Sequence, residues 1–196
     1  YAEARQELAA MLDGAASNKD KASILGQMSM VSMLLGEEQA DKAGKQKQFA
    51  EGIRYAEQGI KLNPSDESLW MWHCANVGRD CQTRSLKDQL AAVSVMTEDL
   101  STILNKLGRT ECSEAWQALA EIYFNHPFKS NDAAINFTRR SLMTIPKAEL
   151  RIYCYAFFAL YVFLFVYVIK VPGKDRRRIT FLVSACKVFT FEQIKA

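Results

Sequence analysis

The side chains that could do chemistry in this chain are few and scattered. His73 and Cys74 are neighbours and Cys81 lies nearby, so all three are potential metal ligands. A zinc site needs three or four ligands that converge, and no partner at a suitable spacing follows them. If the chain is read as helical repeats, His73 and Cys74 also occupy positions that face the core. We therefore expect packed side chains here, with no bound metal and no cofactor.

Nucleophilic and acid–base catalysis have no better support. Cys112 and His126 could form a cysteine–histidine pair, but nothing in the sequence positions or activates either one, and there is no glycine-rich oxyanion or phosphate-binding loop. The acidic pairs Glu37–Glu38 and Glu98–Asp99 fall on predicted helix surfaces or turns, where solvated faces are expected. We predict no catalytic residues and a protein that is not an enzyme.

The charge of the chain is unevenly placed. The 196 residues carry a net charge of +3. Residues 1–169 hold 18 Lys and Arg against 20 Asp and Glu, whereas residues 170–196 hold 7 against 2. The long N-terminal part is therefore not a basic nucleic-acid surface. The basic run Lys174–Arg178 follows an apolar segment, which allows contact with anionic lipid, although an ordinary solvated turn remains the simpler interpretation.

The cysteines and the first residue give some information about the cellular compartment. There are five Cys and no pair has the CxxC spacing, so we expect reduced, mostly packed thiols and no disulfide framework. The first residue is Tyr1, which suggests a processed or truncated protein, either periplasmic or membrane-associated in a bacterium, or cytoplasmic. No targeting signal is visible, and this carries no conclusion.

The best-defined element is the stretch Ser113–Pro146, which predicts two short helices. One face of the first helix carries Trp116, Leu119, Ala120 and Tyr123 at i, i+3, i+4 and i+7. Pro127 requires that helix to end near Asn125. The second helix has a narrow face of small and apolar residues, namely Ala133, Ala134, Phe137, Ser141 and Leu142. Large residues facing small ones predict a closely packed antiparallel hairpin.

Five more helices are expected before this hairpin, which makes an all-α protein with about eight helices once the region after Pro146 is included. Apolar periodicity, capping residues and glycines place them at residues 2–13, Asp20–Leu35 with a stop at Gly36, Ala43–Leu62, Glu67–Val77 and Ser85–Leu107. Ser85 and Asp88 form a capping signature at the start of the last of these, and Gly108 follows its end. Residues 78–84 are expected to form a polar connection.

The pattern of residues 43–160 resembles the tetratricopeptide repeat (TPR) family, in which 34-residue helix–turn–helix units stack. Trp116, Leu119, Ala120 and Tyr123 match the first helix of a unit, and Ala134 and Pro146 match the second. The flanking matches are Trp70 and Cys74 in one unit and Gly52, Gly59 and Pro64 in the one before. Trp70 and Trp116 are 46 residues apart, so the array is irregular. More narrowly, the chain resembles TPR-like proteins of the microtubule-dynamics-regulator type and their bacterial relatives.

The resemblance implies an array of antiparallel helix hairpins in a right-handed superhelix, with a concave groove that binds another protein. Carried over position by position, the groove residues are Met71, Ala75, Glu114, Gln117, Glu121, Phe124 and Tyr153. Met71 and Ala75 stand where a basic residue and Asn would be needed to clamp a C-terminal carboxylate. The expected partner is therefore a peptide or helix with apolar and basic side chains. Alternatively, these residues pack against the terminal helices.

The composition changes after Glu149, and the resulting tail has several interpretations. Ile152–Ile169 contains 18 residues without a charge, which allows a buried packing helix of the array or a single membrane anchor. Two strands joined at the Pro-Gly turn, or a non-native C-terminus, are further alternatives. We predict one helical-repeat domain over residues 1–169 and a separate tail over residues 170–196. The protein is then an interaction scaffold that binds no nucleic acid, or alternatively a membrane-tethered accessory protein.

Overall fold

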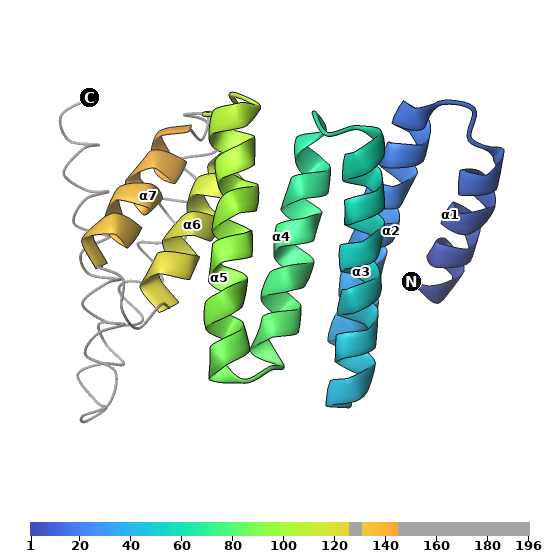
Figure 1. Ribbon diagram of the computed structural model, residues 1–196, viewed down its shortest axis with the longest axis horizontal. Helices are drawn as coiled ribbons and strands as arrows, with labels where there is room; N and C mark the ends of the chain where they lie inside the picture. The colour runs from blue at the N-terminus through green and yellow to red at the C-terminus, as the bar shows by residue number, and fades with distance from the viewer. Residues whose placement is uncertain (126–130, 145–196) are drawn as a thin grey trace, which may run out of the picture. The chain divides into compact units, whose positions relative to one another are not determined.

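The computed structural model describes residues 1–125 and 131–144. The chain divides into two compact units, Tyr1–Thr110 (unit 1) and Glu111–Ala196 (unit 2). Within the described residues the prediction of an all-α fold is confirmed (Figure 1). Unit 1 contains α1 (Ala2–Gly14), α2 (Asn18–Glu38), α3 (Lys42–Leu62), α4 (Glu67–Gln82), α5 (Leu86–Ser101) and a π-helical turn (Thr102–Lys106), and the described part of unit 2 contains α6 (Ser113–Asn125) and α7 (Asn131–Thr144). The domain boundary predicted at residue 169 lies outside the described residues.

Short polar side chains cap the starts of α2, α3, α4 and α5. Asp41 precedes α3 and accepts a hydrogen bond from the backbone N–H of Gly44 at 2.7 Å. The predicted capping signature of α5 is confirmed, because the Ser85 hydroxyl accepts from the Asp88 N–H at 3.4 Å and donates to the Asp88 carboxylate at 2.7 Å. Such caps satisfy N–H groups that have no partner inside the helix. Gly108 has a φ of +69°, the left-handed conformation that glycine supplies beyond a helix end.

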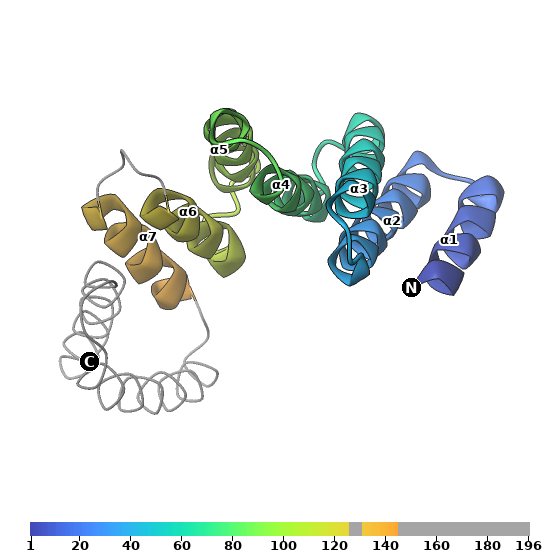
Figure 2. The ribbon, with the colours of Figure 1, turned by 90° about the horizontal axis from the view of Figure 1, so that it is seen from below.

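The helices α2, α3 and α4 pack closely because glycine lets their backbones approach. The Ser29 hydroxyl on α2 donates to the carbonyl of Gly52 on α3 at 2.8 Å. Leu69 on α4 fills a slot lined by Gly59 of α3 and Gly26 of α2. These contacts pair residues in opposite order along α2 and α3, so the two helices run antiparallel. Figure 2, seen from below, shows α2, α3 and α4 next to one another. Gly52 and Gly59 therefore lie on the packing face of α3.

Two local predictions were wrong. Gly36 is not a helix stop, because α2 continues to Glu38 and a Cβ at Gly36 would lie 2.4 Å from the ring of Phe49. This glycine makes room for an aromatic ring and does not end the helix. Residues 78–84 are not a polar connection, since α4 extends to Gln82. There the Arg84 guanidinium holds the Asp80 carboxylate four residues earlier, an ion pair at the helix end that polarity alone does not distinguish from a loop.

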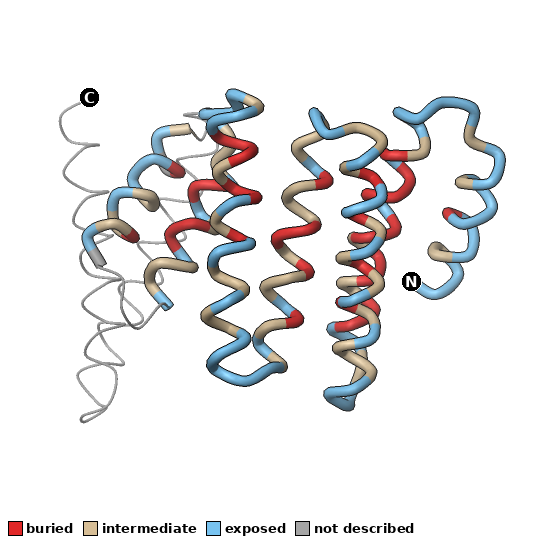
Figure 3. The backbone as a smooth tube through the Cα atoms, in the orientation of Figure 1, coloured by how far each residue is buried: buried red, intermediate tan, exposed pale blue. Residues whose placement is uncertain are grey.

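The core of unit 1 lies along α2. Its buried cluster consists of Leu8, Ile24, Leu25, Met28, Val31 and Leu35. The half-buried side chains of Leu12, Ala15, Tyr55 and Leu62 pack against this cluster. Leu8 is the buried residue of α1, and Figure 3 shows that most of α1 is exposed. Met28, at the centre of this cluster by sequence, is 3% exposed.

The described part of unit 2 is the predicted hairpin of α6 and α7. The rings of Trp116 and Phe137 stack with centroids 5.9 Å apart, and Tyr123 meets the same Phe137 edge-on at 5.0 Å. The Ser141 hydroxyl, near the end of α7, donates to the carbonyl of Ser113 at the start of α6 at 2.9 Å. The two helices are therefore antiparallel, and the fully buried Ala134 provides the small surface on which α6 packs.

Candidate functional site

The two faces of α6 differ in composition. Ala115, Trp116, Leu119 and Ala120 are buried. Glu114, Gln117 and Glu121, here called the α6 stripe, recur at i, i+3 and i+7 and so share the opposite side of the helix. All three are exposed. The packing of one side against α7 therefore directs the two carboxylates and the amide between them into solvent.

Contacts to α7 hold the α6 stripe in place from behind. The aromatic stacking of Trp116 on Phe137 fixes the helix about its own axis. The guanidinium of Arg140 lies 4.8 Å from the centroid of the Trp116 ring, a distance at which a cation is attracted to the ring face. The Ser141 hydrogen bond to the carbonyl of Ser113 anchors the residue next to Glu114. The stripe is therefore built on a rigid element, as a binding surface requires.

The carboxylates of the α6 stripe are themselves held. The pKa of Glu114 lies below its usual value, chiefly because its carboxylate accepts a hydrogen bond from its own backbone N–H at the start of α6. Partial burial acts in the opposite direction, but its effect is smaller. The Ser113 hydroxyl also donates to this carboxylate at 3.0 Å, and the Cys112 thiol lies 3.6 Å from it. The amide of Gln117 donates to the Glu121 carboxylate at 3.3 Å. At neutral pH the stripe therefore presents an ionised, oriented Glu114 two helical turns from Glu121.

The other predicted groove residues differ in their location and burial. Phe124 continues the line of the stripe and is half-buried. Met71 and Ala75 are half-buried on α4, which belongs to unit 1. Gly78, three residues after Ala75 on α4, lies against α5, because a Cβ there would be 3.2 Å from the Met96 sulfur. The end of α4 that carries Gly78 is thus in contact with α5, whereas Tyr153 lies outside the described residues.

The most unusual polar cluster of unit 1 joins α3, α4 and α5. His73 Nδ1 lies 2.7 Å from Asp99 Oδ2, and both residues are buried. The other ring nitrogen, Nε2, lies 3.9 Å from the Glu57 carboxylate. Burial lowers the pKa of His73, but the hydrogen bond and charge of Asp99, assisted by Glu57, raise it by more, so the net shift is upward. An imidazolium between two carboxylates is the state that this arrangement favours.

Sequence reasoning placed Asp99 on a solvated surface, and this was wrong. Asp99 is 3% exposed. A signal was present, since Asp99 follows Met96 by three residues and precedes Ile103 by four, which puts it on the apolar stripe of α5. A carboxylate on such a stripe needs a buried cation. His73 was correctly predicted to face the core, but its partner was missed.

Cys74, the neighbour of His73, is a protonated, buried thiol. Burial, with smaller contributions from Asp99 and Cys81, raises the pKa of Cys74 to about 12, so its thiol is not ionised at neutral pH. The reactive form of cysteine is the thiolate. Within residues 1–125 and 131–144, no three His, Cys, Asp or Glu side chains are arranged to hold a metal ion. Of the pair Cys112–His126, His126 lies outside the described residues.

The apolar segment Ile152–Ile169, for which a membrane anchor was one interpretation, also lies outside the described residues. In the part of the chain that the structure describes, no helix combines the length and the apolar character needed to cross a membrane. The membrane alternative therefore rests on the sequence of this segment.

The sequence was compared with known proteins. No protein-family model matches the chain, and no curated protein matches it.

Proposed function

We propose that this protein is a non-enzymatic interaction module that binds a basic, amphipathic helix on the α6 stripe. The observation that carries the proposal is the pair of exposed carboxylates, Glu114 and Glu121, on a helix whose opposite face is buried. The resemblance to tetratricopeptide repeats is consistent with this use, because helices of that position line the binding groove in the family. Complementary charge favours a ligand with Lys or Arg at matching positions.

The chemistry of the surface defines the ligand further. Glu114 and Glu121 are seven residues apart, which separates them by roughly 10 Å along the axis. Two cations separated by two turns of a partner helix can reach both carboxylates together. The half-buried ring of Phe124 at the end of the line provides apolar surface for one Leu or Met side chain of the ligand.

Charge reversal on the α6 stripe tests this proposal. We expect Glu114→Lys with Glu121→Lys to weaken binding of a fluorescent amphipathic peptide of Lys and Leu by at least about tenfold, because two favourable charge contacts become repulsive. Fluorescence anisotropy with the full chain measures the affinity. The matched control is Glu3→Lys with Glu7→Lys on α1, where both glutamates are exposed. Equal weakening by the two double variants would mean that net charge, and not the stripe, determines binding.

The alternative proposal is a membrane tether formed by Ile152–Ile169, which is supported by the length of this uncharged run. We expect the full chain to float with neutral phosphatidylcholine vesicles in a density gradient. A lysine in the middle of the run, Leu160→Lys, should reduce the floating fraction, since a charge near the bilayer centre costs about 3 kcal/mol. A chain that stays at the bottom of the gradient would exclude the tether.

A further inference from the structure

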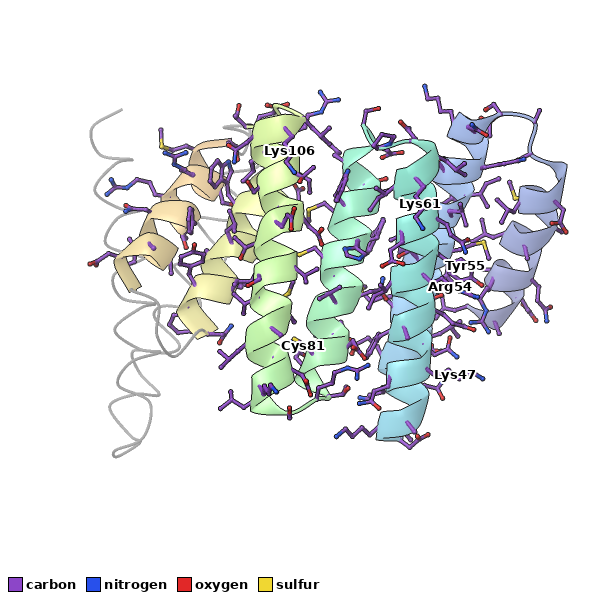
Figure 4. All side chains as sticks on the ribbon, viewed as in Figure 1. Lys47, Arg54, Tyr55, Lys61, Cys81 and Lys106 are labelled. Atoms are coloured by element: carbon purple, nitrogen blue, oxygen red, sulfur yellow. The ribbon has the colours of Figure 1, made fainter. Side chains whose placement is uncertain are left out.

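One exposed side of α3 carries a row of cations that the proposed function does not use. Lys47, Arg54 and Lys61, here called the α3 row, are seven residues apart and all exposed (Figure 4). Successive members are therefore separated by about two helical turns, or roughly 10 Å. Lys61 also lies in the last turn of α3, where a cation interacts favourably with the helix dipole.

The acidic residues nearest to the α3 row are engaged by other helices. Glu51 flanks the row on the side of α1 and forms an ion pair with Arg5 at 2.8 Å. Glu57 flanks it on the other side, toward α4, with its carboxylate 3.9 Å from His73. Among the described residues, no carboxylate lies within 4 Å of the cationic group of any member of the row. The positive charge of the α3 row is therefore not neutralised by an ion pair within the described residues, and the row can attract an anionic ligand.

The central cation of the row is supported by an aromatic ring. The guanidinium carbon of Arg54 lies 5.2 Å from the centroid of the Tyr55 ring. Tyr55 in turn packs against the buried cluster of unit 1. A guanidinium that rests on a ring fixed by the core loses less conformational freedom when it binds a carboxylate. Arg54 is thus the member of the α3 row whose side chain is supported by a packed ring.

We propose that the α3 row is a second docking surface, whose partner is an acidic helix with a carboxylate at every seventh residue. Such a helix repeats its charges at the same spacing of two turns when it lies alongside α3. A repeat of seven residues drifts by about 20° per two turns on each helix, so a slight left-handed crossing keeps the two rows in contact. The charges are opposite in sign to those of the α6 stripe, and the two surfaces select different partners.

Other polyanionic partners fit the α3 row less well. The large apolar residues that are exposed in the described chain are Tyr1, Met11, Leu86, Val95 and Met143, and none lies on α3. A membrane-surface helix needs such residues for insertion. A duplex nucleic acid carries about one charge per 1.7 Å of its axis, which is far denser than the roughly 10 Å spacing of the row.

A peptide of defined spacing tests the inference. The probe is a fluorescent alanine-rich helical peptide with Glu at every seventh position, and its control has the same composition with the Glu positions shuffled. We expect the full chain to bind the first peptide more tightly. Lys47→Glu, Arg54→Glu and Lys61→Glu together should weaken this binding by about tenfold or more. The control triple Lys19→Glu, Lys87→Glu and Lys106→Glu makes the same change in net charge at exposed sites and should alter it by less than about twofold.

Several results would overturn the inference. These are equal loss of binding in the two triple variants, equal binding of the shuffled peptide, or tighter binding to phosphatidylserine vesicles or single-stranded DNA that depends on the row. Should the triple variant fail to melt cooperatively, Arg54→Gln alone is measured, and it must still weaken binding of the regularly spaced peptide but not of the shuffled one. The α6 stripe is intact in all of these variants, so failure here leaves the proposed function standing.

Discussion

Replacing Gly52 with Ala is expected to destabilise unit 1 by about 2–3 kcal/mol, although alanine is the better helix former. A Cβ at this position would lie 2.1 Å from Oδ1 of Asn76 on α4. Asn76 cannot move away cheaply, because its amide donates to the carbonyl of Ser29 at 3.2 Å and to that of Trp72 at 2.9 Å. The side chain is fully buried, so broken hydrogen bonds are not replaced by water. Urea unfolding followed by circular dichroism measures the loss.

A matched glycine provides the control. Gly14 is also helical, but no atom would lie within 4 Å of a Cβ there, so Gly14→Ala should be neutral or stabilising by up to about 1 kcal/mol. The clash between a Cβ at position 52 and the Asn76 side chain should also disappear when Asn76 is truncated. In the background of Asn76→Ala, the further change Gly52→Ala should cost nothing, which a double-mutant cycle detects. A Gly52→Ala variant as stable as the parent protein would contradict the close packing of α3 on α4.

Removing the imidazole of His73 should cost about 3 kcal/mol at pH 6, because it leaves the Asp99 carboxylate buried without its cation. His73→Gln is the variant of choice, since its side chain remains polar and similar in size. Replacing both residues, His73→Leu with Asp99→Leu, should restore much of the loss, as buried ion pairs often exchange for apolar pairs at little cost. Urea unfolding at fixed pH measures all three proteins. A His73→Gln variant that unfolds at the parent's urea concentration would contradict the buried pair.

The same pair predicts a direction for the pH dependence of stability. The pKa of folded His73 is raised above the unfolded value of 6.5, so the folded protein binds more protons between these two values. The contribution of His73 to the free energy of unfolding is therefore fully present below pH 6.5, and it is lost as the pH rises through the folded pKa. Burial also raises the pKa of Asp99, and this effect is larger than the lowering by His73. The contribution of Asp99 to stability therefore also decreases as the pH rises above 3.8. His73→Gln should abolish the decrease near neutral pH, and an unchanged decrease would assign it to other groups.

Much of the fold could be predicted because local signals agree with it. The Ser85 cap, the glycine at position 108 and the aromatic and small residues of the last described hairpin each act within a few residues of chain, and each was predicted. The errors at Gly36 and Asp99 have a different origin. Gly36 makes room for Phe49 and Asp99 is paired with His73, and both partners lie on another helix. A local pattern does not reveal a contact made between helices.

The candidate site was predictable in part for the same reason. The exposure of Glu114, Gln117 and Glu121 follows from the burial of Trp116 and Leu119, because positions on one helix fix each other's direction. Whether residues of α4 contribute to the same surface depends on backbone angles between the helices, which side-chain periodicity does not encode. Sequence reasoning assigned no role to the α3 row, although its seven-residue spacing was visible in the sequence.

The most direct test of the proposed binding surface is an NMR titration of the isotope-labelled full chain with the Lys and Leu peptide. If the α6 stripe binds it, the largest amide shift changes should occur at Glu114, Gln117, Glu121 and their neighbours on α6, and they should vanish in the Glu114→Lys, Glu121→Lys variant. Shift changes centred on α1 or on the face of α4, or none at a peptide concentration that saturates the anisotropy signal, would contradict the account.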